Sequence, residues 1–206
     1  MKAAVLFGAV CTWLMCSGEA QAPDDDPITE TLLKLNANKD FDASEALLLD
    51  FLKERPAAGT VVYRYLSDLN EKEQQERVIA VVSKLLPGFE ENAPKWSAQL
   101  LHLRAMALLF GRYPKSHNSK DIGWAKNDLI LAITYDENIT DAQFNLAILY
   151  GIDGNVERAK EHLQRAIDTA APSQTDYVKL VRGVVSMANE RPAAFVEYAK
   201  QFYLRP

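Results

Sequence analysis

Few residues in this chain have the type and spacing that chemistry requires. The three histidines, His102, His117 and His162, are far apart in the sequence and fall on different predicted elements. His162 follows Glu161, and adjacent residues of a helix do not share a face, so we expect a surface histidine there and no metal ligand. The HExxH zinc motif, the GxSxG nucleophile motif and a phosphate-binding glycine loop do not occur in the sequence.

Two groups of carboxylates could bind a cation or act as a general acid. The run 24–26, three aspartates, lacks the spacing and the glycine of a calcium-binding EF-hand loop, so we interpret it as a solvated segment. Asp136 and Glu137 end a predicted helix, and two carboxylates alone do not make a glycosidase. We therefore predict that the protein is not an enzyme and that it has no cofactor and no metal site.

The first 22 residues have the pattern of a secretory signal peptide. Lys2 supplies a positive charge, residues 3–16 are apolar, and Ala20-Gln21-Ala22 forms a cleavage site. The apolar run is shorter than the ~20 residues of a membrane span. We expect residues 1–22 to be removed, so that the protein contacts a membrane only through the cleaved signal. An uncleaved anchor and lipidation at Cys16 are alternatives that the sequence leaves open.

The composition of the chain is that of a globular protein. Of its 206 residues, 48% are apolar and 25% are charged, and the net charge is −5. No basic face is visible, so we expect no binding to nucleic acid. Both cysteines, Cys11 and Cys16, fall in the signal, which excludes disulfides and thiolate chemistry from the mature chain. The expected location is the periplasm, with secretion as the alternative.

Apolar residues recur at helical spacing throughout the mature chain, which predicts an all-α fold of about ten helices. Pro56 and Pro87-Gly88 predict helix ends, Asn92 predicts a helix start, and the polar residues 113–119 predict a long connection. The helices group into five pairs: 28–37 with 41–55, 60–69 with 71–86, 93–112 with a helix beginning near 120, the two helices of 141–172, and 175–188 with 192–204.

The segment 141–172 resembles a tetratricopeptide repeat, a helix–turn–helix unit of about 34 residues. Small and large residues alternate where its helices must touch, a glycine occupies the turn, and a proline ends the unit. The matching residues are Leu146, Ala147, Tyr150, Gly154, Ala159, Leu163, Ala166 and Pro172. The resemblance covers a best repeat at 140–173, an interrupted repeat at 93–138 and a degenerate C-terminal cap at 174–206.

This resemblance implies a right-handed α-solenoid of about five helix–turn–helix pairs over residues 23–206. The alternative is an irregular helical domain with one chance match. In tetratricopeptide arrays the first helix of each pair lines a concave groove. Carried over to this chain, that geometry gives as partner-binding residues Leu101, Arg104, Leu108, Arg112, Phe144, Asn145, Ile148 and Ile152. The same apolar residues could instead be plain core.

If these positions are exposed, they form an apolar groove with an arginine edge, which suits an amphipathic helix or an extended peptide. One variant of the family clamps a C-terminal carboxylate, and Arg104, Asn145 and Arg182 fall near matching positions. Leu108 and Val178, however, replace two of the polar residues that the clamp requires.

The resemblance and the signal together imply a non-enzymatic protein–protein interaction scaffold of the cell envelope. It would bind a peptide, or a subunit of a larger assembly, in its concave groove. The alternatives are a helical subunit or domain of an envelope enzyme and a secreted effector.

Overall fold

The structure, a computed structural model, describes residues 26–204. The predicted signal peptide, residues 1–22, lies outside these described residues. Between residues 26 and 204 every regular element is a helix and no strand occurs, which confirms the all-α prediction. The pairs in contact are α2 (Pro27–Ala37) with α3 (Phe41–Glu54), α4 (Gly59–Glu71) with α5 (Gln75–Asn92), α6 (Pro94–Met106) with α8 (Ser119–Tyr135), α9 (Thr140–Ile152) with α10 (Val156–Asp168), and α11 (Thr175–Glu190) with α12 (Pro192–Phe202).

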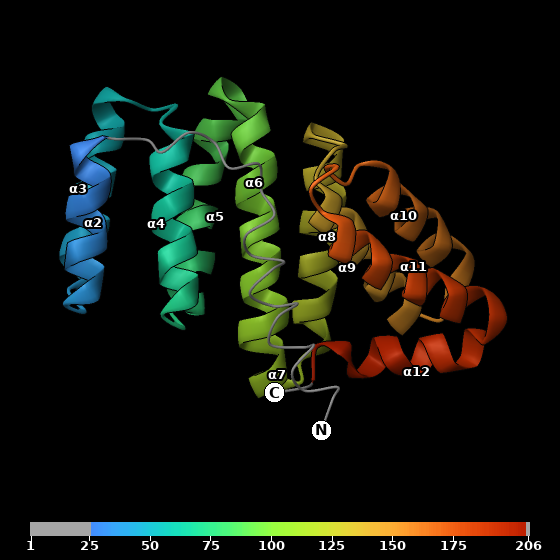
Figure 1. The fold of residues 1–206 in the computed structure, drawn as a ribbon. Helices are drawn as coiled ribbons and strands as arrows, with labels where there is room; N and C mark the ends of the chain where they lie inside the picture. The colour runs from blue at the N-terminus through green and yellow to red at the C-terminus, as the bar shows by residue number, and fades with distance from the viewer. Residues whose placement is uncertain (1–25, 205–206) are drawn as a thin grey trace.

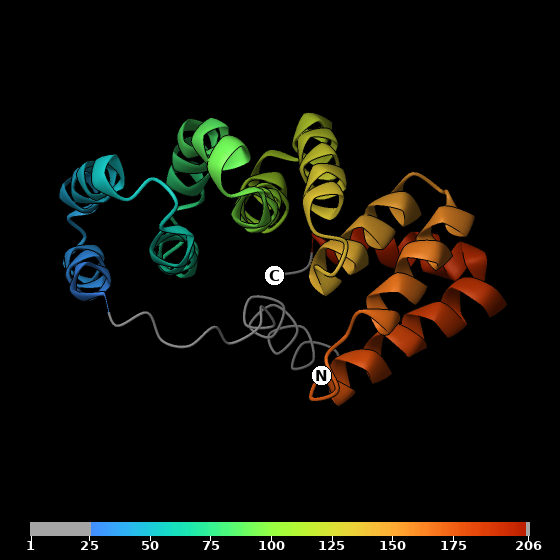
Figure 2. The ribbon, with the colours of Figure 1, turned by 90° about the horizontal axis from the view of Figure 1, so that it is seen from above.

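The first three pairs follow one another along an arc. The first helices α2, α4 and α6 contact one another in succession on the inner side of the arc, and α3, α5 and α8 lie on its outer side (Figure 2). The helices α9, α10 and α11 continue the row with a tilt, whereas α12 runs crosswise beneath them (Figure 1). Because of this change of direction, α12 packs against α9 as well as against α11.

The turns within the first, second and fourth pairs share one hydrogen-bond pattern. In each turn the N–H of the residue that caps the second helix donates to a carbonyl five residues earlier: Asp40 to Leu35, Gln74 to Leu69 and Asn155 to Tyr150. The residues just before these caps are left-handed: Lys39, Glu73 and Gly154 have φ values of 61°, 58° and 75°. This is the Schellman ending of a helix. Lys39 and Glu73 are 34 residues apart (73 minus 39).

The buried side chains form two clusters that meet at α6. Leu100 and Leu103 of α6 belong to the cluster of the first two pairs, whereas Leu101 and Ala105 belong to the cluster of the later pairs. The helix α9 is buried at every residue from Thr140 to Gly151 because α8, α10 and α12 surround it. A helix that is apolar around its whole circumference is stable only in such surroundings.

The predicted helix end at Pro87-Gly88 is wrong, because α5 continues to Asn92. A proline inside a helix removes one hydrogen bond and costs about 3 kcal/mol. The side chain of Phe89, which is only 2% exposed, anchors the last turn in the core and offsets that cost. Asn92 therefore ends α5, and Ala93, not Asn92, caps the start of α6.

Most of the long connection predicted after the helix 93–112 is also helical. The π-helix η1 (Ala107–Arg112) and the short helix α7 (Tyr113–Ser116) extend α6. In a regular α-helix the ring of Pro114 would clash with the carbonyl of Phe110. The wider π-helical turn just before Pro114 gives the ring room, so the chain stays helical to Ser116.

Candidate functional site

The predicted groove is closed in this structure. Leu101, Phe144 and Ile148 are fully buried and Leu108 is 2% exposed, so the prediction of an open apolar groove is wrong for these four residues. These four residues are instead part of the hydrophobic core, which was the alternative interpretation of the sequence. Ile152 is half-buried and packs against the same cluster.

The helix α12 covers the part of the groove that was assigned to α9. The ring of Phe144 packs against Phe202 with centroids 5.7 Å apart. A Cβ atom on Gly151 would lie 2.8 Å from side-chain atoms of both Ala199 and Phe195, so α12 approaches the α9 backbone closely. The helix that lies on α9 therefore belongs to the chain itself and is not a bound partner.

The two predicted arginines are engaged within the protein. Arg104 donates two hydrogen bonds to the carboxylate of Asp128, from Nε at 2.8 Å and from Nη2 at 2.7 Å, and a third to Ser83. The Asp128 carboxylate raises the pKa of the Arg104 guanidinium. Asn145 donates to the carbonyl of Asp141 and accepts from Tyr203. With Arg104 and Asn145 both bound internally, the carboxylate clamp does not form.

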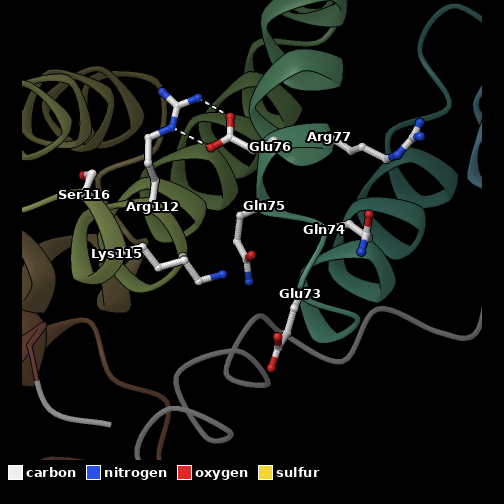
Figure 3. Close-up of a pocket in the computed structure, with 9 residues that line it drawn as sticks. Glu73, Gln74, Gln75, Glu76, Arg77, Arg112, Lys115 and Ser116 are labelled. Carbon is white, nitrogen blue, oxygen red and sulfur yellow. Dashed lines mark hydrogen bonds and ion pairs between the residues drawn. The ribbon is translucent and has the colours of Figure 1, made fainter. Parts of the chain in front are cut away.

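Arg112 lies in a cavity of about 430 Å³ between the α4–α5 turn and η1 (Figure 3). Its guanidinium forms a bidentate ion pair with the carboxylate of Glu76, and its Nη1 lies 3.7 Å from Oδ1 of Asp121. The hydrogen bond from Arg112 lowers the pKa of the Glu76 carboxyl. Gly111 allows η1 to lie close to the start of α5, because a Cβ atom at residue 111 would lie 2.0 Å from Cγ of Gln75.

The chemistry of this cavity is that of a charged surface recess. Its lining residues are Glu73, Gln74, Gln75, Glu76, Arg77, Gly111, Arg112, Lys115 and Ser116. No histidine or cysteine is among them, and the hydroxyl of Ser116 donates to the carboxylate of Asp121. The recess can form hydrogen bonds and ion pairs, but it contains no nucleophile paired with a histidine base.

None of the three histidines lines the recess. His102 is buried in α6, and desolvation lowers its pKa to about 4. His162 is half-buried: its ring stacks on Tyr150 at 5.3 Å and its Nδ1 hydrogen-bonds Gln143. Burial, and next the charge of Arg165, lower the pKa of His162 to about 4. Across residues 26–204, no three His, Cys, Asp or Glu side chains gather as metal ligands.

The outer face of α8 is the feature that sequence reasoning missed. The described part of the chain has five exposed large apolar side chains, and four of them lie on this helix. They are Trp124, Ile130, Leu131 and Tyr135, which are 52%, 40%, 44% and 36% exposed. The other exposed positions from residue 123 to 135 are Gly123, Asn127 and Thr134, all uncharged. We call these seven residues the α8 face.

The outer faces of the other second helices differ from the α8 face. The exposed residues of α10 include Glu157, Arg158, Glu161, Arg165 and Asp168. Those of α3 and α5 also include Asp, Glu or Lys side chains. The sequence pattern that indicates this face is a second apolar stripe on α8, formed by Trp124, Leu131 and Tyr135 at spacings of seven and four residues. It lies opposite the packing stripe of Ala125, Leu129 and Ala132.

No protein-family model, no curated protein and no solved structure matches this chain. Of the helices between residues 26 and 204, none has the length and the apolar character needed to cross a membrane. A functional argument therefore depends on the surfaces described above.

Proposed function

We propose that the chain is a right-handed, tetratricopeptide-like α-solenoid that acts as a non-enzymatic protein interaction scaffold. The repeated Schellman turn supports the repeat architecture, since Lys39 and Glu73 are separated by the 34 residues of one tetratricopeptide unit. The succession of α2, α4 and α6 along the inner side of the arc supports it as well. The crosswise α12 suits the terminal cap that such arrays require.

The proposed setting is the cell envelope, and the proposed partner is a protein subunit of an envelope assembly. The signal-like pattern of residues 1–22 supports export into the periplasm. The absence of cysteine beyond residue 16 fits a protein whose stability comes from its core.

The α8 face is the single observation that carries the proposed binding function. A patch with aromatic and aliphatic side chains and without charge has the composition of an interface core. Trp and Tyr are the residue types most enriched among binding hot spots. The docking surface that we propose is therefore the α8 face on the outer side of the arc, and not the concave groove that the sequence suggested.

The test is capture of protein from envelope extracts by the immobilised protein. The test variant, Trp124→Glu with Leu131→Glu, removes the two most exposed apolar side chains of the α8 face. Burial of each contributes about 1.5–3 kcal/mol, so we expect the affinity to fall at least tenfold for each substitution.

The control variant is Gln164→Glu, on the exposed and charged face of α10. It should capture the same proteins as the unmodified chain. Circular dichroism and thermal unfolding establish that both variants fold. If the doubly substituted protein captures its partners at full strength, the α8 face is not the docking surface.

A further inference from the structure

We infer that a second copy of this chain covers the α8 face, with the two α8 helices antiparallel across a two-fold axis. The inference rests on the proposed function, because it names the occupant of the proposed docking surface. It depends on the distribution of charge at the ends of α8 and on the order of large and small residues between them.

Exposed charges flank the α8 face with opposite signs. Lys120 is exposed at the start of the helix, Glu137 is exposed just beyond its end, and no exposed residue between them is charged. In an antiparallel pair, Lys120 of each copy lies near Glu137 of the other, and two-fold symmetry forms this contact twice. A parallel pair would place like charges together. The helix dipoles favour the antiparallel arrangement too.

The same alignment matches the uncharged residues in size. When Lys120 lies opposite Glu137, Thr134 falls opposite Gly123 and Ile130 falls opposite Asn127, which leaves Tyr135 and Leu131 one residue away from these two small residues. A Cβ atom added at Gly123 would meet no other atom within 4 Å, so the space beside this glycine can receive the phenol ring of the second copy. The two-fold axis passes between Asp128 and Leu129, so Ile130 lies close to its own counterpart.

The size of the contact sets the expected strength. A helix of 17 residues is about 25 Å long, so the α8 face is smaller than a standard protein interface. We therefore expect a dimer that dissociates in the micromolar range and not an obligate one.

Sedimentation velocity of the purified protein over a range of concentrations measures this association. We expect a reversible monomer–dimer equilibrium that Trp124→Glu shifts at least tenfold towards monomer. Lys120→Glu should weaken the dimer by roughly two- to tenfold, since each exposed ion pair contributes little and occurs twice. Glu137→Lys should do the same, and the two charge reversals together should restore the association.

A cross-linking experiment tests the antiparallel register. Ile130→Cys, in a chain without Cys11 and Cys16, should be cross-linked to its own copy by a short bismaleimide, whereas Gln164→Cys on α10 should not. Failure of the double charge reversal to restore the dimer would overturn the antiparallel alignment. A protein that remains monomeric up to millimolar concentration would overturn the dimer altogether. If such a monomer still captures envelope proteins through Trp124 and Leu131, the proposed function stands and only this inference fails.

Discussion

The phenol hydroxyl of Tyr203 donates a hydrogen bond of 2.9 Å to Oδ1 of Asn145, which joins the end of α12 to the buried face of α9. Both residues are buried, and Asn145 also donates from its amide nitrogen to the carbonyl of Asp141. The closing of the predicted groove therefore depends on a polar contact as well as on the packing of Phe202 and Phe195.

The hydroxyl of Tyr203 should stabilise the fold measurably. Tyr203→Phe keeps the ring but leaves Oδ1 of Asn145 without this donor, so we expect a loss of about 1–2 kcal/mol in the free energy of unfolding. Denaturant titration measures it. Tyr135→Phe is the matched control, because its hydroxyl bonds Glu90 at the exposed surface. Equal losses for the two variants would contradict the assigned role of the buried contact.

Gly151 should be essential for the approach of α12 to α9. In Gly151→Ala, the new methyl group would lie 2.8 Å from Ala199 and Phe195, so we expect destabilisation by about 1–3 kcal/mol. Gly183→Ala, in the interior of α11 with no atom within 4 Å of the new Cβ, should instead stabilise by about 0.5–1 kcal/mol. Thermal unfolding of the two variants should shift in opposite directions, and a shift in the same direction would count against close packing at Gly151.

Substitutions at the left-handed turn residues Gly154 and Glu73 should change the free energy of unfolding in opposite directions. Gly154→Ala should lose about 1–2 kcal/mol, because a Cβ atom disfavours a positive φ. Glu73→Gly should gain about 1 kcal/mol, since Glu73 has a φ of 58° at the corresponding place in the second pair. Chemical denaturation measures both. A loss of stability in Glu73→Gly would argue against the shared turn geometry.

The ion pair between Arg104 and Asp128 predicts a coupled response. Arg104→Met leaves the carboxylate of Asp128, whose side chain is only 7% exposed, without its charged partner, and we expect a loss of about 3 kcal/mol. Adding Asp128→Leu should recover most of this loss, because the double variant buries no lone charge. A double-mutant cycle in denaturant tests the coupling, and simple additivity of the two single losses would refute it.

His102 predicts a dependence of stability on pH. Burial lowers the pKa of this imidazole from the ordinary 6.5 to about 4, so the unfolded chain binds a proton in this interval that the folded chain does not. The unfolding free energy should therefore fall as the pH decreases from about 6.5 to 4. In His102→Leu the difference between pH 7 and pH 5 should be smaller. If the two proteins show the same pH dependence, His102 does not contribute to it.

Local patterns explain why the helices themselves could be predicted. The spacing of Leu146, Tyr150 and Leu163, and the glycine at 154, reflect helical periodicity and a left-handed turn, both of which involve residues close in sequence. Boundaries failed where a distant contact overrode a local signal. Pro87 reads as a helix end, but the burial of Phe89 keeps the helix intact.

The sequence by itself determined an all-helical chain, the grouping of its helices and the turns that join them, because these features follow from neighbours a few residues apart. Only the tertiary structure decided which apolar faces are covered. Phe144 and Trp124 both lie on helices with apolar residues on more than one side, yet α12 buries the first and nothing in the described chain buries the second. Whether an apolar face is buried depends on where residues distant in the sequence lie in the fold. Helical periodicity, which reflects only nearby residues, does not specify this.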